Sequence, residues 1–284
     1  MNKQMEFYIL CVGLLGNVLA LIIFSKTLVD HSIKSRFSIG IGLVQTFLDL
    51  LACLANLMNS FLPRDYVEKS QLLSNIMRTR LIYWAIMNYR GLSIVCSACG
   101  RYNNMLRPFF SRTYFFQLIV AIILGALVNC ISLYCLYTLH SDWVDCSDLC
   151  STCEYRPEIV IAAFSAICGF VYRFLFPLTV CFYAYTRLIS ICENINDIKM
   201  QRAVGDLKRM RFLDGWFYMF CLILHEIYFV LNFFTTKRYV NEKTQLYQIL
   251  LLITYLYPCV HPFLSIIMYQ RFRDPLVALF RKNK

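Results

Sequence analysis

Charged residues are scarce in this sequence: Asp, Glu, Lys and Arg make up 16% of its 284 residues. A soluble protein of this length would carry about 25% charged residues. Hydrophobic residues reach 59%, which is more apolar surface than one soluble core can bury. The low charge and the mean hydropathy of +0.55 exclude an ordinary soluble domain and indicate a polytopic membrane protein.

Signals for several other functions are missing. The sequence has no glycine-rich phosphate loop, zinc-protease motif or nucleophile elbow, so it predicts no enzyme and implies no cofactor. It shows no internal repeat, so an inverted-repeat transporter is not indicated. The net charge of +11 does not predict nucleic-acid binding, because the basic residues lie between hydrophobic segments. There they indicate topology and contacts with lipid headgroups.

Long hydrophobic runs are abundant. A helix needs about 20 apolar residues to cross a bilayer, and seven segments meet this length, at 7–28, 38–62, 76–101, 114–138, 159–187, 211–235 and 246–269. The first run is too long for a cleaved signal peptide, so we expect an uncleaved anchor. The sequence thus predicts one all-α membrane domain over 1–284, a seven-helix bundle with a short surface helix at 271–281.

The distribution of charge predicts an orientation. Lys and Arg are more frequent in the connections that face inward if the N-terminus lies outside, and the loop between the fourth and fifth segments is acidic. By the positive-inside rule, we expect a multi-pass protein of the plasma membrane, with its N-terminus outside and its C-terminus in the cytoplasm.

Short motifs follow one another in five of the seven segments. They are Gly16-Asn17, Asp49, Gly100-Arg101-Tyr102 with Pro108 beyond, Pro177 with Tyr185, and His261-Pro262 with Ser265. Each motif alone is weak, but the ordered set resembles the rhodopsin-like (class A) G-protein-coupled receptors. Departures such as Gly100 in place of the family's acid, and a sixth segment that keeps only Cys221, resemble a divergent branch of the nematode serpentine chemoreceptor type.

The resemblance implies a receptor that passes an extracellular small-molecule or peptide signal to a heterotrimeric G protein. Arg101, Tyr102, Tyr185 and Pro108 then belong to the switch that couples to the G protein. In the family's resting state the neighbouring acid holds the arginine, which Gly100 cannot do. We therefore expect Arg101 to bond Tyr185 or Asp206, or to meet water.

A buried polar core is also expected. Arg90 lies eleven residues before Arg101. At this position the family has a residue that helps to bind a sodium ion next to the aspartate of the second helix. We predict that Arg90 replaces the ion in a bidentate pair with Asp49, completed by His261 and Asn17, and that no metal is bound. The alternative is that Arg90 extends toward the membrane surface.

The family register places a ligand pocket between the outer halves of the helices. Its candidate residues are Tyr83, Trp84, Met87, Arg173, His225, Glu226 and Tyr255. Two readings stay open for Arg173: it pairs with Glu226 across two helices, or it binds an anionic ligand. Two readings also stay open for His225: it tunes ligand binding with pH, or it is a hydrogen-bonded core histidine, which we favour.

The loop after the fourth segment contains Cys146, Cys150 and Cys153, two of which are expected to form a disulfide. A zinc site there is the alternative. Other functions also stay open: a seven-helix transporter, a ligand-gated channel, or a receptor-like membrane protein that no longer signals.

Overall fold

A computed structural model describes residues 3–30, 33–61, 76, 80–106, 120, 123, 125, 127, 129, 167–195, 198–236 and 245–268. These residues are helical apart from Arg80, Asn194 and Ile195, and none of them lies in a strand. The elements are α1 (Lys3–Asp30), α2 (Ile33–Phe61), α5 (Leu81–Leu106), η1 (Val171–Leu175), α8 (Phe176–Glu193), α9 (Ile198–Met210), η2 (Arg211–Phe217), α10 (Tyr218–Thr236) and α11 (Gln245–Met268).

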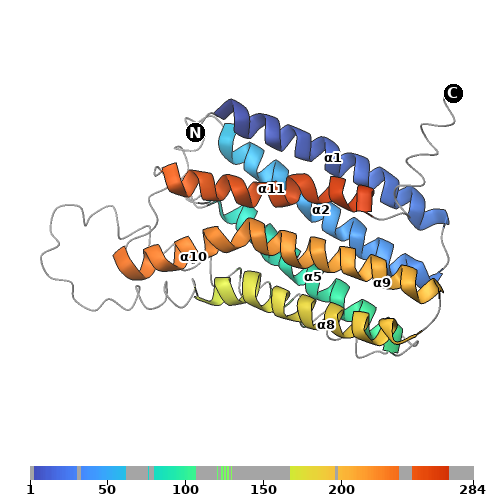
Figure 1. Cartoon of the computed structure of the whole chain (residues 1–284). Coiled ribbons are helices and arrows are strands. Elements are labelled where there is room, and N and C mark those ends of the chain that lie inside the picture. Colours follow the sequence, from blue (N-terminus) through green and yellow to red (C-terminus); the bar gives the residue numbers. More distant parts are fainter. Residues whose placement is uncertain are drawn as a thin grey trace, which may run out of the picture.

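The helices lie side by side in one bundle (Figure 1). The last residues of α1, α5, α8 and α11 lie at the same end as the first residues of α2 and α9, which we call the Asp30 end. α5 packs against α2 on one side and against η1 and α8 on the other. The chain therefore runs back and forth along the bundle, as a multi-pass membrane protein does.

Five helical segments within the described residues are long and apolar enough to cross a membrane: Gln4–Leu28, Ile39–Phe61, Ile167–Glu193, Met200–Leu231 and Gln245–Met268. α5 is not among them because polar residues, Asn88, Arg90, Ser93 and Ser97, lower its mean hydropathy. The count of seven stays a prediction. Of segment 114–138 only five positions are described, all helical, and the expected surface helix at 271–281 lies outside the described residues.

Several helices begin or end at residues other than those at which the hydrophobic segments begin or end. The third begins at Leu81 instead of 76, because Arg80 has φ 51°, which an α-helix does not accommodate. The sixth begins at Ile198 instead of 211, and the fifth continues to Glu193 instead of 187. Hydropathy marks the part of a helix in lipid, whereas its backbone hydrogen bonds continue into the aqueous layer.

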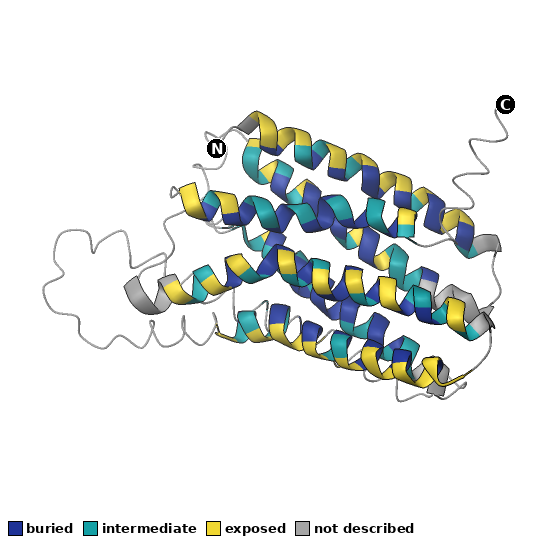
Figure 2. Cartoon of the chain, viewed as in Figure 1, coloured by how far each residue is buried: buried dark blue, intermediate teal, exposed yellow. Residues whose placement is uncertain are grey.

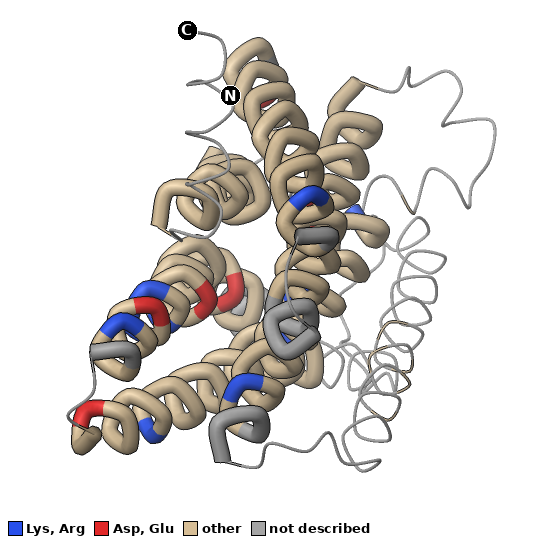
Figure 3. Tube along the Cα trace, turned by 90° about the vertical axis from the view of Figure 1, so that its right-hand side faces the viewer, with Lys and Arg blue, Asp and Glu red and all other residues tan. Residues whose placement is uncertain are grey.

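The extension α9 is amphipathic. It buries Val204, Leu207 and Met210 at a spacing of three, while Lys208 and Arg209 are exposed. Charged residues gather along α9 and the adjoining end of α8 (Figure 3). On the helices of the bundle, Figure 2 shows buried residues on the side that faces the other helices and exposed residues on the outer side. Outward residues such as Leu15 and Phe220 suit contact with lipid.

Prolines inside the helices create the contacts between them. A proline has no N–H, so the carbonyl four residues earlier loses its helical donor. The carbonyls that lack a donor for this reason are those of Arg173, Thr254 and Pro258, which precede Pro177, Pro258 and Pro262 by four residues. A side chain of another helix replaces each missing donor: Tyr218 donates to Arg173 O (2.6 Å), Tyr83 to Thr254 O (3.3 Å) and Asn17 to Pro258 O (2.9 Å).

Two glycines allow close approach of helices. A Cβ at Gly91 of α5 would lie 3.1 Å from the carbonyl oxygen of Arg173 and 3.1 Å from the ring of Pro177. A Cβ at Gly13 of α1 would lie 3.0 Å from the Cα of Cys259 on α11. These contacts bring α5 against η1 and α1 against α11, and so fix the frame around the polar core.

Candidate functional site

The structure brings Asp49 of α2 and Arg90 of α5 together in the centre of the bundle. Arg90 Nε donates to Asp49 Oδ1 at 3.0 Å, and their side chains are 1% and 0% exposed. Because the pair is so deeply buried, removing either charge alone takes from the other its nearest opposite charge, which is costly at this depth. The reading in which Arg90 extends to the membrane surface is wrong.

The pair is not bidentate, as the sequence had suggested, because the terminal nitrogens of Arg90 have other partners. Nη1 donates to Ser93 Oγ at 3.1 Å, and Nη2 donates to the Tyr257 hydroxyl at 2.7 Å. The guanidinium also lies over the Tyr257 ring, 5.1 Å from its centroid. These contacts hold the guanidinium plane between α5 and α11.

His261 occupies the second oxygen of Asp49. Its Nδ1 lies 2.9 Å from Asp49 Oδ2, and its Nε2 lies 3.0 Å from Arg90 Nη2. Arg90 Nη2 also lies 3.4 Å from Nδ1, so the guanidinium nitrogen sits over the imidazole ring and not on the axis of one ring nitrogen. His261 is therefore part of the core as predicted, in contact with both members of the ion pair.

Asn17 does not join this group, and that part of the prediction is wrong. Its side-chain amide donates to the carbonyls of Gly13 and Pro258, both at 2.9 Å. Asn17 thus has a structural role, because its amide supplies the donor that the Pro258 carbonyl loses to Pro262. Ser265 remains close to the core, with its hydroxyl 3.4 Å from His261 Nε2.

Asp214 belongs to the site and was missed. It lies on η2, is 4% exposed, and places Oδ1 4.0 Å from Arg90 Nη2 and 3.9 Å from His261 Nε2. It falls only three residues inside the expected segment 211–235, where a charge suggests the membrane boundary. In the sequence, Asp214 stands out only as an acid that precedes a long apolar run. Because the structure starts this helix at Ile198, Asp214 lies well inside the helix and not at its end.

The residues predicted to form the switch extend from this core toward the Asp30 end. Tyr185 of α8 donates to Asp214 Oδ2 at 3.4 Å, and its hydroxyl lies 3.5 Å from Ser97 Oγ. Arg101 Nε donates to the same Ser97 Oγ at 3.3 Å. Ser97, which sequence reasoning did not single out, therefore takes the place expected for Tyr185 or Asp206.

The other predicted switch residues are placed differently. Asp206 pairs with Arg209 on its own helix at 3.3 Å. Tyr102 is half-buried and packs on the main hydrophobic core, whereas Pro108 lies outside the described residues. We call the connected set Asp49, Arg90, His261, Asp214, Tyr185, Ser97 and Arg101 the polar chain.

The expected ligand-pocket residues cluster on the other side of the core. Arg173 Nε lies 2.8 Å from Glu226 Oε1, and Nη2 donates to Oε2 at 3.3 Å, which is the pairing alternative. The Arg173 guanidinium lies 4.3 Å from the centroid of the Trp84 ring. Trp84 in turn packs on His225, with ring centroids 4.5 Å apart.

These side chains fill the space between the helices. Tyr83 packs edge-on against Tyr255, with centroids 5.3 Å apart, and Met87 is fully buried beside them. Both nitrogens of His225 are buried without a hydrogen bond in the described part of the chain, so the hydrogen-bonded core histidine is not what the structure has. Glu226 Oε1 is its near neighbour, 3.9 Å from Nδ1.

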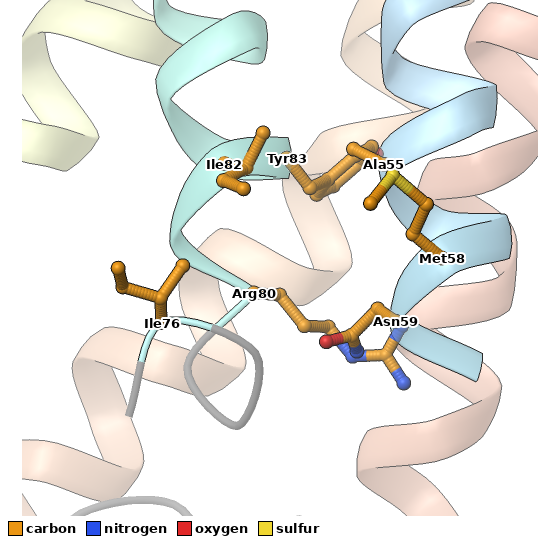
Figure 4. A pocket seen from close by; sticks show the side chains of 7 residues that line it. All are labelled: Ala55, Met58, Asn59, Ile76, Arg80, Ile82 and Tyr83. Carbon is orange, nitrogen blue, oxygen red and sulfur yellow. The ribbon is translucent and has the colours of Figure 1, made fainter. Parts of the chain in front are cut away.

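A small cavity lies next to this cluster, between α2 and the beginning of α5 (Figure 4). Its lining consists of Ala55, Met58, Asn59, Ile76, Arg80, Ile82 and Tyr83. Tyr83 is the single member of the expected pocket set on that wall. Arg80 is tied to the bundle by a hydrogen bond to Tyr255 and by Glu6 of α1, 3.9 Å away.

No protein-family model matches the chain, and a comparison with curated protein sequences gave no match. The site therefore has to be interpreted from its own geometry. Within the described residues, no group of three His, Cys, Asp or Glu side chains is arranged to hold a metal ion. Cys146, Cys150 and Cys153, with their expected disulfide, lie outside those residues.

Proposed function

We propose that the chain is a rhodopsin-like G-protein-coupled receptor, divergent and of chemosensory type. It would transmit an extracellular small-molecule or peptide signal to a heterotrimeric G protein from the plasma membrane, with its C-terminus in the cytoplasm. The proposal rests on the ordered motifs of the sequence. One structural observation carries it further: the polar chain runs continuously from the buried Asp49 to Arg101 near the Asp30 end.

The polar chain supports a switching mechanism because it crosses between elements that can move separately. Asp214 lies on η2, whereas its contacts Tyr185, Arg90 and His261 belong to α8, α5 and α11. An outward movement of η2 would separate Asp214 from Tyr185 and change the surroundings of Ser97. Arg101 would then lose its support and become available to the G protein.

The sixth helix suits the role of a lever. It runs without a break from Ile198 through η2 to Thr236. A change at Arg173, Trp84, His225 and Glu226, which we call the outer cluster, would therefore reach the other end of this helix as a rigid-body movement. In the packing of this structure polar contacts with α8 and α11 hold that end. Lys208 lies 2.8 Å from Glu193 of α8, and Arg209 donates to the carbonyl of Met268 on α11 at 3.0 Å.

The outer cluster is the proposed site of the signal. Glu226 and His225 lie on the same helix as Asp214, and Arg173 joins them from η1. A ligand that contacts Arg173 or Trp84 would compete with the Arg173–Glu226 pair and so act on both helices. The effect is a shift between two packings, with a size set by the ligand's differential affinity for them.

Basal signalling tests the proposal without a known ligand. Full-length chain and Arg101→Ala are compared in cells carrying G-protein dissociation sensors, at equal surface expression. Lys26→Ala is the matched control, since it removes an exposed positive charge from α1 near the same end. We expect basal signalling that Arg101→Ala abolishes and Lys26→Ala preserves. No signal in the wild type, or equal loss in both variants, would contradict it.

Topology provides an independent test. Residue 101 is expected on the cytoplasmic side, so a cysteine placed there should react with a membrane-impermeant thiol reagent only after the cells are opened. Labelling in intact cells would place Arg101 at the outer surface and remove the receptor interpretation.

A further inference from the structure

Two thiols from different helices meet in the interior of the bundle. Cys53 of α2 and Cys259 of α11 have their sulfur atoms 3.7 Å apart, and the two residues are 0% and 3% exposed. They are 206 positions apart in the sequence, so the contact exists only through the packing of α2 against α11. The proposed receptor mechanism does not use either thiol.

The packing of α1 directs the two thiols at each other. A Cβ at Gly13 would lie 2.5 Å from Cys259 Sγ, so this glycine leaves the space in which the sulfur lies. Leu10 joins the two cysteines in one buried apolar cluster, and Asn17 Nδ2 lies 3.8 Å from Cys53 Sγ. Neighbours on α1 therefore hold the sulfur atoms in contact.

The separation of the sulfur atoms is small enough for a covalent bond to form. Sulfur atoms in a disulfide are about 2.0 Å apart, so the two thiols need to approach each other by about 1.7 Å. Cys259 lies between Pro258 and Pro262, whose missing N–H groups interrupt the helical hydrogen bonds of α11. This part of α11 can adjust more easily than an uninterrupted helix.

The burial of the pair decides which oxidant suits it. A large or charged reagent does not enter the interior of a helix bundle, whereas hydrogen peroxide is small and uncharged. Peroxide oxidises a thiol to a sulfenic acid, which condenses with a second thiol to a disulfide if one lies close by. Cys53 and Cys259 supply the two thiols at that distance.

We propose that Cys53 and Cys259 are a redox-active pair, which hydrogen peroxide converts into a disulfide between α2 and α11. One thiol attacks the peroxide: an S–O bond forms, the O–O bond breaks, and the thiol proton leaves with the departing oxygen as water. The second thiol then attacks the sulfenic acid. An S–S bond forms, the S–O bond breaks, and the hydroxyl group leaves with the second thiol proton as water. The two sulfur atoms are oxidised and the peroxide is reduced.

The disulfide would join two helices that supply the polar chain. Cys53 lies one turn from Asp49 on α2, and Cys259 lies two residues before His261 on α11. Asp49 Oδ2 and His261 Nδ1 are 2.9 Å apart, so oxidation would fix α2 to α11 next to this contact. The inference does not depend on the proposed receptor function.

The sequence allows a direct test, because Cys259 is the one cysteine that follows Cys221. A protease site inserted between residues 236 and 245 produces a C-terminal fragment that can be joined covalently to the rest only through Cys259. The full-length chain is reduced, placed in lipid nanodiscs and treated with excess hydrogen peroxide. It is then cleaved, dissolved in SDS with N-ethylmaleimide to block free thiols, and run on a non-reducing gel.

We expect the two fragments to stay joined after peroxide treatment and to separate when a reductant is added. Cys53→Ala should separate under the same treatment. Cys221→Ala is the matched control and should stay joined, since it removes an equally buried thiol, 1% exposed, from another helix. Separate fragments in the peroxide-treated wild type overturn the proposal. Fragments that stay joined in Cys53→Ala overturn it as well, because Cys259 would then have another partner.

Oxidation of the unfolded chain separates the native contact from chance pairing. In SDS, Cys259 can meet any of the other thirteen of the fourteen cysteines. The share of Cys259 that is linked to Cys53, measured by mass spectrometry of peptides, should therefore be several-fold lower when peroxide is added in SDS than in nanodiscs. An equal or larger share in SDS would mean that the folded bundle does not bring the two thiols together, and the proposal would fail.

Discussion

Replacing Asp49 by Asn and Arg90 by Leu, singly and together, measures the central ion pair. Arg90→Leu removes the donor 3.0 Å from Asp49 Oδ1 and leaves a carboxylate with His261 as its remaining contact. Breaking a buried pair in this way costs about 3–5 kcal/mol. Asp49→Asn should cost less, because the carboxyl group of Asp214, with Oδ1 4.0 Å from Arg90 Nη2, remains next to the guanidinium.

The double variant should cost less than the sum of the two single variants, by about 1–3 kcal/mol, because neither charge is then left alone. The free energy of unfolding is obtained by titrating the purified chain in mixed micelles with SDS and following its circular dichroism. The control is the exposed pair Glu193–Lys208, 2.8 Å apart, whose loss should cost no more than about 1 kcal/mol. If the costs at Asp49 and Arg90 add within about 0.5 kcal/mol, the two side chains are not coupled and the reasoning is wrong.

Two further predictions concern contacts between helices outside the central ion pair. Gly91→Ala should destabilise the fold by about 1–3 kcal/mol in the same assay, because its Cβ would press on the backbone of Arg173; Gly40→Ala, where a Cβ meets nothing within 4 Å, should not, and equal effects would refute the close approach. Glu226→Gln should cost about 3–5 kcal/mol by leaving Arg173 unpaired, and Arg173→Met in that background should recover part of the loss; no recovery would mean that the two side chains do not interact.

The sequence could predict the features that depend on local composition. Apolar runs of bilayer length gave helices α1, α2, α8, α10 and α11 near their expected places, since any such run must satisfy its backbone hydrogen bonds internally. A charge inside a run must face a partner, so Asp49 with Arg90, and Arg173 with Glu226, were within reach of sequence reasoning. The count of crossings and the disulfide stay predictions.

Only the tertiary structure decided how the polar groups are shared. A proline in the sequence shows that a carbonyl loses its donor, but not that Asn17, Tyr83 and Tyr218 replace it from other helices. Likewise, no local pattern shows that Asp214 reaches the guanidinium of Arg90 while Asn17 does not. The reason is physical: hydropathy and motif spacing fix which residues lie on a helix, whereas the rotation and depth of each helix follow from packing contacts such as those at Gly13 and Gly91.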